Sequence, residues 1–139
     1  MSSGGPDAIR KLADAARAAR AHAYAPYSKF RVGAAVLLAD GAMAIGSNVE
    51  NASYGLTICA ERVAIFSAQV QHRGAKIVAL AVSAGDDSHV HDHDNTRMPC
   101  GACRQVMMEF MDPAATVWID GVGERSLAEL LPVPFKLKP

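Results

Sequence analysis

The amino-acid sequence predicts an α/β fold in which helices cover the faces of one mixed sheet. Segments with the hydrophobic periodicity of helices alternate with short apolar runs typical of strands, in the order α-β-β-α-β-α-β. Half of the 139 residues are hydrophobic and a fifth are charged, which is the composition of a globular domain with a real core. No internal repeat, low-complexity segment or long linker divides the chain, so we expect residues 1–139 to form a single domain.

The first third of the chain predicts a helix followed by a β-hairpin. Apolar residues recur every three or four positions over Asp7–His22, and Pro6 suits the first turn of a helix. The largely apolar segment Phe30–Ala39 predicts a strand. The dipeptide Asp40-Gly41 favours the left-handed backbone angles of a tight turn, so we expect Ala42–Val49 to return as a second strand.

The middle of the chain predicts a helix, a buried strand and a polar loop. Thr57 can cap a helix over Cys59–Gln71, and Gly74 closes it. The short apolar run Ile77–Ser83 is typical of a buried strand. The segment Gly85–Met98 is polar and contains three of the five histidines, which predicts a surface loop.

The last third predicts another helix, a strand and a short helical turn. The helix covers Gly101–Met111 and ends at Asp112-Pro113, because the residue before a proline disfavours the helical conformation. Ala115–Ile119 is typical of a strand, and Ser126–Leu131 of a helical turn. Between them, Gly121–Arg125 looks too short for a full fifth strand.

Charge and hydropathy argue against two classes of partner. The 14 basic and 14 acidic side chains cancel, which leaves no electrostatic footprint for nucleic acid. No apolar run is longer than Ala34–Ala39, which is far shorter than the ~20 residues that span a bilayer, and Met1–Pro6 lacks the basic and hydrophobic regions of a signal peptide. We expect a cytoplasmic protein that binds neither nucleic acid nor a membrane.

Three cysteines carry the strongest chemical signal in the sequence. Cys59 lies at the start of one predicted helix, and Cys100 and Cys103 lie in the turn that opens the next. The free N–H groups and the macrodipole of a helix N-terminus favour the thiolate, the form that binds metal. Three protein ligands with a fourth position open to water define a catalytic zinc site, so we expect one Zn²⁺ per chain. Glu61, two residues after the first cysteine, is suitably placed for general acid–base catalysis.

Three other interpretations of the cysteines remain open from the residues alone. The turn from Cys100 to Cys103 could be a dithiol redox centre, which leaves Cys59 unused. The thiols could also be unrelated buried side chains, although all three lie at helix starts. A structural zinc, which would leave Glu61 without a purpose, could take its fourth ligand from the polar loop, whose histidines are His89, His91 and His93.

Several motifs in one order resemble a known family. Cys59-Ala60-Glu61 followed by Pro99-Cys100-Gly101-Ala102-Cys103 resembles the signature of the zinc-dependent nucleoside and nucleobase deaminases, in which His or Cys is the first ligand. Three further segments resemble one group within that superfamily, the small homotetrameric cytidine deaminases with three cysteines. These segments are Phe30–Ala35, Asn48–Tyr54 and Thr57–Arg62.

The resemblance runs from about Tyr24 to Phe135 and is interrupted at one place. His89–Asp94 forms a His/Asp-rich insertion in a loop that family members often keep shorter. We expect this insertion to be exposed to solvent and to have no catalytic role.

Fold and activity follow from the resemblance as expectations. It implies a cytidine-deaminase-like, three-layer α/β/α fold with one mixed, roughly five-stranded sheet. It also implies an enzyme that uses a zinc-activated water to convert cytidine and 2′-deoxycytidine to uridine and 2′-deoxyuridine plus ammonia, in pyrimidine salvage. The implied assembly is a homotetramer with shared active sites. Alternatives are a deaminase of another aminopyrimidine or of a nucleoside antibiotic such as blasticidin S, and a non-catalytic, zinc-stabilised interaction module.

The resemblance also implies a role for individual residues. The three cysteines hold the zinc, and Glu61 carries protons between water, the ring N3 and the leaving amine. Arg62 and Arg104 each directly follow a ligand-bearing motif and are candidates to donate hydrogen bonds to the thiolate sulfurs, and the resemblance favours Arg62. The implied substrate-binding residues are Phe30 against the base, Ala60 through its N–H to the cytosine O2, Asn48 and Glu50 at the sugar hydroxyls, and Ala52, Tyr54 and Phe135 from a neighbouring subunit.

Overall fold

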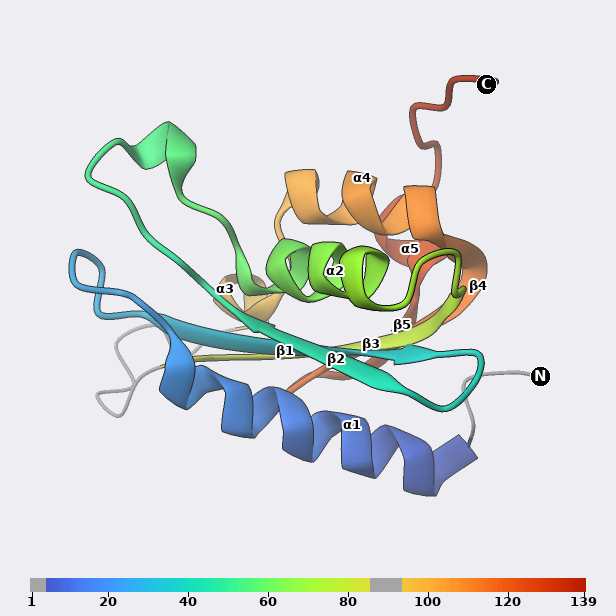
Figure 1. Cartoon of the computed structure of the whole chain (residues 1–139), viewed down its shortest axis with the longest axis horizontal. Coiled ribbons are helices and arrows are strands. Elements are labelled where there is room, and N and C mark those ends of the chain that lie inside the picture. The colour runs from blue at the N-terminus through green and yellow to red at the C-terminus, as the bar shows by residue number, and fades with distance from the viewer. Residues whose placement is uncertain (1–4, 86–93) are drawn as a thin grey trace.

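One five-stranded sheet forms the middle layer of the molecule in this computed structural model, which describes residues 5–85 and 94–139 (Figure 1). The strand order is β2-β1-β3-β4-β5. The sheet is mixed, because β3 pairs with β4 in parallel while the other neighbouring strands are antiparallel. The strands are β1 (Arg31–Leu38), β2 (Met43–Ser47), β3 (Ile77–Gly85), β4 (Met111–Ile119) and β5 (Gly123–Ser126).

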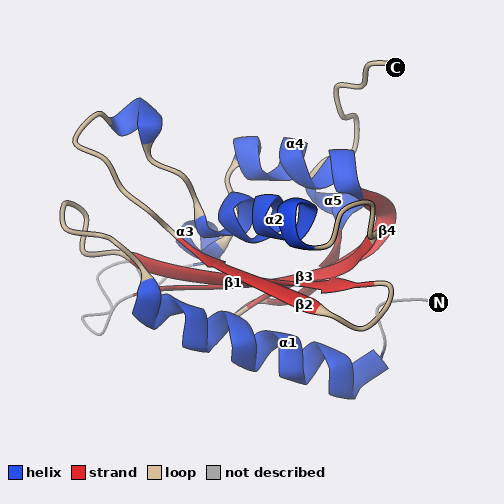
Figure 2. Ribbon diagram, in the orientation of Figure 1, coloured by secondary structure: helices blue, strands red, loops and turns tan. Residues whose placement is uncertain are grey.

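Helices cover both faces of this sheet (Figure 2). On one face lies α1 (Gly5–Ala19), and on the other α2 (Ala60–Gln71) and α4 (Gly101–Phe110) lie side by side. This arrangement confirms the predicted α/β fold with one mixed sheet. No helix in the described part of the chain is long and apolar enough to cross a membrane. The shorter helices are η1 (Arg20–His22), η2 (Tyr54–Leu56), α3 (Asp94–Arg97) and α5 (Leu127–Leu130).

An apolar core lies on each side of the sheet, because the central strands are buried on both faces. Along β1, Val36 and Leu38 pack in the core beneath α2 and α4, whereas Ala35 and Leu37 pack against α1. A strand that is buried on both faces needs apolar residues at every position. This explains why the sequence of β1 is continuously apolar and does not alternate.

Two glycines on neighbouring strands let helices approach the sheet closely from opposite faces. A Cβ atom at Gly33 of β1 would overlap the carbonyl oxygen of Ala16 in α1. A Cβ atom at Gly46 of β2 would overlap the backbone of Ala64 and lie 2.7 Å from the carbonyl oxygen of Ala60, both in α2. The first turn of α2 is therefore seated directly on the backbone of β2.

The end of the sheet differs from the prediction in two ways. β4 begins at Met111, directly after α4, four residues before the predicted strand Ala115–Ile119. The dipeptide Asp112-Pro113 lies within a register shift between β3 and β4, where a residue without an N–H removes no ladder hydrogen bond. The segment Gly121–Arg125, expected to be too short, contributes to β5, which pairs antiparallel with β4.

The predicted cap of the second helix is also wrong. Cys59 is the N-cap residue of α2, and its side chain makes no capping hydrogen bond. The hydroxyl of Thr57 instead accepts a hydrogen bond from the N–H of Asn51, at 3.0 Å. Thr57 therefore stabilises the loop before the helix and not the helix itself.

Smaller corrections concern the ends of three segments. The first α-helix ends at Ala19 and continues as the 3-10 turn η1. β3 runs to Gly85, two residues beyond its predicted end. Of the predicted loop Gly85–Met98, Asp94–Arg97 is a turn of helix. The structural-zinc interpretation needs a histidine of the insertion as the fourth zinc ligand. These histidines lie outside the described residues, and they are His89, His91 and His93.

Candidate active site

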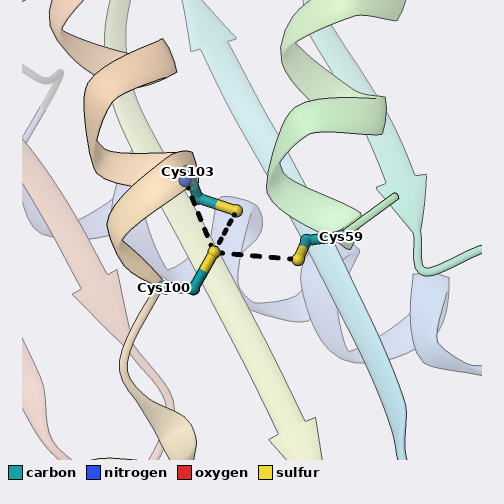
Figure 3. Close-up of side chains that lie close together, drawn as sticks. All are labelled: Cys59, Cys100 and Cys103. Atoms are coloured by element: carbon teal, nitrogen blue, oxygen red, sulfur yellow. Dashed lines mark hydrogen bonds between the residues drawn. The ribbon is translucent and has the colours of Figure 1, made fainter. Parts of the chain in front are cut away.

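The starts of α2 and α4 bring three cysteine thiols together (Figure 3). Cys59 is the N-cap residue of α2, Cys100 is the N-cap residue of α4, and Cys103 lies in the first turn of α4. The Sγ atom of Cys100 is 3.8 Å from that of Cys59 and 3.2 Å from that of Cys103. All three sulfur atoms lie within 4.8 Å of one another. Helices that are adjacent on the sheet thus place ligands from two distant segments in one cluster.

The three thiols differ in exposure and in charge. Cys103 is buried, Cys59 is half-buried and Cys100 is exposed. A hydrogen bond with Cys103, reinforced by the guanidinium of Arg62, lowers the pKa of the Cys59 thiol to about 5 despite its partial burial. The same hydrogen bond, together with burial, raises the pKa of Cys103. Cys59 is therefore the more readily ionised thiol of this pair, and the cluster opens to solvent at Cys100.

Arg62 is the cationic neighbour of this cluster. Its Nη2 atom donates to the Sγ atom of Cys59 at 3.5 Å. Its Nε atom is buried and has no hydrogen-bond partner among the residues that the structure describes. The guanidinium thus has a donor to spare beside a group of sulfur atoms, whose acceptor strength grows when they are thiolates.

These observations fit a zinc ion. Thiolate sulfur is a preferred ligand of Zn²⁺, and three ligands leave a fourth tetrahedral position open. The spacing of the three sulfur atoms suits one shared ion, and the surplus donor of Arg62 suits the excess negative charge of three thiolates around it. Cys59, Cys100 and Cys103 are therefore a group suited to binding one zinc.

Glu61 supplies a buried carboxyl next to the thiols. It lies in the first turn of α2 and is only 4% exposed. Burial, with a smaller contribution from the charge of Cys59, raises the pKa of Glu61 to about 7. The carboxyl can therefore hold or release a proton near neutral pH.

A cavity of about 250 Å³ joins the thiols to residues from the opposite side of the site. Asn48 and Glu50 follow β2, and Phe30 immediately precedes β1. Besides Cys59 and Cys100, five residues that the sequence predicts for the site line this cavity. These are Phe30, Asn48, Glu50, Ala60 and Glu61.

Hydrogen bonds to the backbone hold Asn48 in place. Its Oδ1 atom accepts from the N–H of Val32, and its Nδ2 atom donates to the carbonyl of Phe30, both at 2.9 Å. One amide hydrogen and further acceptor capacity remain after these two bonds. The side chain is thus positioned by β1 while retaining polar capacity toward the cavity that it lines.

Glu50 is held by the loop that precedes β1. Its Oε1 atom accepts from the N–H groups of Tyr27 and Ser28, at 3.0 and 3.1 Å, and its Oε2 atom accepts from the hydroxyl of Ser28. Although partial burial raises the pKa of Glu50, the hydrogen bonds from Ser28 outweigh that effect and hold the pKa below its ordinary value. Glu50 is therefore an ionised, oriented carboxylate.

Three predicted substrate-binding residues lie outside this cavity. Ala52 is exposed, and Tyr54, in η2, is 82% exposed. Phe135 is 66% exposed and belongs to the C-terminal segment that extends away from the sheet beyond α4 (Figure 1). Their predicted role in a neighbouring subunit's site therefore stays a prediction.

Other residues at the site were missed or misassigned from sequence. Ser28 links Glu50 to the pocket wall, because its hydroxyl also accepts from the N–H of Phe30 at 3.0 Å. Gln105 donates from Nε2 to the carbonyl of Phe135 at 2.9 Å. Arg104, a candidate donor to the sulfurs, bonds instead to two backbone carbonyls, and only the three-dimensional contacts reveal this.

A three-cysteine group with an open side, next to a buried carboxyl and a cavity, defines a zinc-dependent enzyme. Comparison with known proteins gives the family. Residues 6–119 match the family model described as the cytidine and deoxycytidylate deaminase zinc-binding region, and the chain belongs to this family.

Relatives that match most of the chain are cytidine deaminases. Cytidine deaminase of Halalkalibacterium halodurans is 46% identical over 121 residues, which cover 84% of this chain and 86% of that protein. Cytidine deaminase of Mycobacterium tuberculosis is 46% identical over 120 residues, which cover 86% of this chain and 83% of that protein. These matches disfavour a dithiol redox centre.

Solved structures extend the agreement to the fold. The crystal structure of cytidine deaminase from M. tuberculosis has a TM-score of 0.79 and 41% identity, and the match covers 93% of this chain and 98% of that one. The structure from Burkholderia pseudomallei has a TM-score of 0.75 and 45% identity, with coverages of 91% and 98%. The fold expected from the sequence motifs is therefore confirmed.

Proposed function

We propose that this chain is a zinc-dependent cytidine deaminase. It hydrolyses cytidine and 2′-deoxycytidine to uridine and 2′-deoxyuridine plus ammonia, as a step of pyrimidine salvage. The observation that carries this proposal is a shared cavity. Cys59 and Cys100 of the thiol cluster and the buried Glu61 line it together with the sugar-binding candidates Asn48 and Glu50. Membership of the deaminase family and the similarity to cytidine deaminases support the same activity.

Proton transfer in this reaction falls to Glu61. A zinc ion held by Cys59, Cys100 and Cys103 would supply the Lewis acidity that makes water a nucleophile near neutral pH. Glu61 takes one proton from the attacking water and passes it to ring N3. It then takes the remaining proton from the same oxygen, now bonded to C4, and gives it to the amine, which leaves as ammonia when the C4–N bond breaks. The buried position of the carboxyl keeps bulk water from competing for these protons.

The substrate is oriented by the other side of the cavity. The carboxylate of Glu50 accepts hydrogen bonds from a sugar hydroxyl, and Asn48 can both donate and accept. Phe30 lies against the base. Ala60 is the first residue of α2, where backbone N–H groups have no partner within the helix, and its N–H donates to the base O2.

We also propose that residues 1–139 act as one cytoplasmic domain that assembles into a homotetramer with shared active sites. Large apolar side chains are exposed near the cavity, on the segments that follow β2, and an interface would cover them. They are Val49, Tyr54 and Leu56, which are 47%, 82% and 64% exposed. The positions of Ala52 and Phe135 outside their own cavity also support sharing.

Metal analysis combined with ammonia release tests the proposed activity. The purified protein should contain one zinc per chain and release ammonia from cytidine and 2′-deoxycytidine. A panel that adds cytosine, deoxycytidylate and blasticidin S separates the nucleoside activity from related deaminations. A zinc-loaded protein that releases ammonia from none of these substrates would contradict the enzymatic proposal and favour a zinc-stabilised interaction module.

A further inference from the structure

Arg104 follows the last cysteine directly, yet its guanidinium bonds to backbone and not to sulfur. Its Nε atom donates to the carbonyl of Pro99 and its Nη1 atom donates to the carbonyl of Leu130, each at 2.9 Å. Both bonds are partly buried. One side chain thus joins the turn before α4 to the end of α5, two segments that lie far apart in the sequence.

The first of these bonds acts on the backbone of Cys100. The carbonyl of Pro99 and the N–H of Cys100 belong to one planar peptide unit, so a bond that fixes the carbonyl also fixes the plane from which Cys100 projects. Cys100 is the exposed thiol of the three, whereas Cys103 is buried in the core and Cys59 is half-buried. Side-chain packing therefore constrains Cys100 least. Its Sγ accepts an N-cap hydrogen bond from the N–H of Cys103 at 3.4 Å, and the path of its backbone sets where that cap lies.

The second bond connects that peptide unit to a helix end that is buried in the core. Leu130 is the last residue of α5 and is buried in the core. A capping box formed by Ser126 and Glu129 closes the other end of α5, which packs against β4 and α4. The carbonyl of Leu130 is one of those that a helix end leaves without a helical partner, so it is free to accept from Arg104.

We propose that Arg104 is a positioning residue of the zinc site, which holds the Pro99–Cys100 peptide unit against the end of α5 so that Cys100 stays within reach of the metal. The inference rests on the proposed function in one respect, namely that Cys59, Cys100 and Cys103 bind zinc. Arginine suits this task because its planar fork offers several fixed donors, whereas the ammonium of lysine is a single point charge.

The rate of zinc release from the holoenzyme tests this proposal. Wild type, Arg104→Met and Arg104→Lys are mixed with excess 4-(2-pyridylazo)resorcinol, well below their melting temperatures, and the coloured zinc complex is followed. Loss of groups that orient metal ligands typically costs 10–100-fold in metal affinity, so Arg104→Met should release zinc at least about tenfold faster. Arg104→Lys should fall between Arg104→Met and wild type.

A matched control separates positioning from general stability. Arg17 also bridges two elements, since it donates to Asp120 at 3.2 and 3.1 Å, but it belongs to α1 on the opposite face of the sheet. Arg17→Met should lower the melting temperature and still release zinc at the wild-type rate.

Each result has a distinct meaning. Wild-type protein without zinc overturns the proposed function and this inference with it. If the wild type holds zinc and Arg104→Met releases it at the wild-type rate, the positioning role alone is overturned. The same conclusion follows if Arg17→Met, at a similar loss of melting temperature, releases zinc as fast as Arg104→Met. If Arg104→Met does not fold, Arg104→Lys carries the same comparison.

Discussion

The carboxyl of Glu61 combines two properties that a proton carrier needs. It is almost completely buried, and that burial raises its pKa to about 7, so its protonated and ionised forms have similar free energies at neutral pH. It also lies at the same helix start as Cys59, which fixes its distance from the metal-binding cluster through a single turn of α2. The start of α2 therefore carries both a candidate metal ligand and the proton carrier.

Replacing Glu61 with glutamine separates the chemical step from the fold. We expect Glu61→Gln to keep zinc and the wild-type circular dichroism spectrum, because the amide has the same size. Turnover of cytidine should fall by about 10²–10⁴-fold, because an amide cannot carry a proton between water, ring and leaving amine. Steady-state ammonia release from a zinc-replete sample measures the loss, and near-normal turnover would contradict the assignment.

At the scale of elements, the sheet positions the site by letting its helices come close. Gly46 seats the first turn of α2, including Ala60, on β2, while Gly33 lets α1 pack on β1. The sequence contains eleven glycines, and only the packing distinguishes those two from glycines with open space around them. A side chain at Gly46 must move backbone, since backbone atoms surround it.

Alanine at Gly46 should therefore be costly. Overpacking typically destabilises by about 1–3 kcal/mol, and we expect Gly46→Ala to lie at or above the top of that range in urea unfolding. The zinc content should fall as well, because the displaced turn follows Cys59. Gly55→Ala is the control, since nothing lies within 4 Å of a Cβ atom there. Equal stability of the two variants would refute the seating of α2.

A polar network ties α1 to the end of β4 on the face opposite the site. Asp120 accepts from Arg17 and, at 2.7 Å, from the hydroxyl of the fully buried Ser83, which in turn accepts from Arg20 at 3.2 Å. Partial burial raises the pKa of Asp120, but the hydrogen bonds from Arg17 and Ser83 outweigh it and hold the pKa below the ordinary value. The ionised carboxylate is therefore the form that the fold stabilises.

This network predicts a stability difference that depends on pH. Because the folded pKa of Asp120 is depressed, its contribution is present above the unfolded pKa of about 3.9 and is lost as the pH falls through the lower folded value. We expect Asp120→Asn to destabilise the protein by about 1 kcal/mol at pH 7, and this difference should shrink below pH 4. Asp14→Asn, which removes a more exposed partner of Arg17, should have little effect at either pH. Thermal unfolding at several pH values measures both.

The fold and the site differ in how far the sequence predicts them. The cysteine cluster was predictable because helix starts are local features and the family motifs include all three thiols. The start of β4 was not, because Asp112-Pro113 has the local signature of a break and its bulge depends on pairing with β3. The partners of Arg104 were equally invisible, since the carbonyl of Leu130 approaches only through tertiary packing.

At the scale of the whole molecule, the C-terminal segment is coupled to the helix that carries two of the thiols. Gln105 of α4 donates to the carbonyl of Phe135, while the aromatic ring remains largely exposed. This hydrogen bond holds the backbone of the segment against α4 and leaves the ring exposed. In the proposed homotetramer, that exposed ring would enter the active site of a neighbouring subunit.

Subunit mixing tests the shared site directly. Deleting residues 135–139 should raise the apparent Michaelis constant for cytidine and leave zinc in place, because the deletion removes the ring proposed to cover the base. Co-refolding this variant with Glu61→Gln should restore part of the normal affinity, since a mixed tetramer contains sites with an intact Glu61 and a neighbour's intact Phe135. An active monomer in light scattering, or unchanged kinetics after deletion, would contradict sharing.

The packing of α4 beside α2 also governs when the metal site can exist. Cys59 and Cys100 are 41 positions apart, and they meet only once α4, which lies in the crossover between the parallel strands β3 and β4, has packed next to α2. Non-local contacts of this kind form slowly, because loop closure costs entropy before packing returns any free energy. In a refolding experiment, we therefore expect the β1–β2 hairpin and α1 to be protected from hydrogen exchange earlier than the thiols acquire zinc. Metal uptake would then mark completion of the fold.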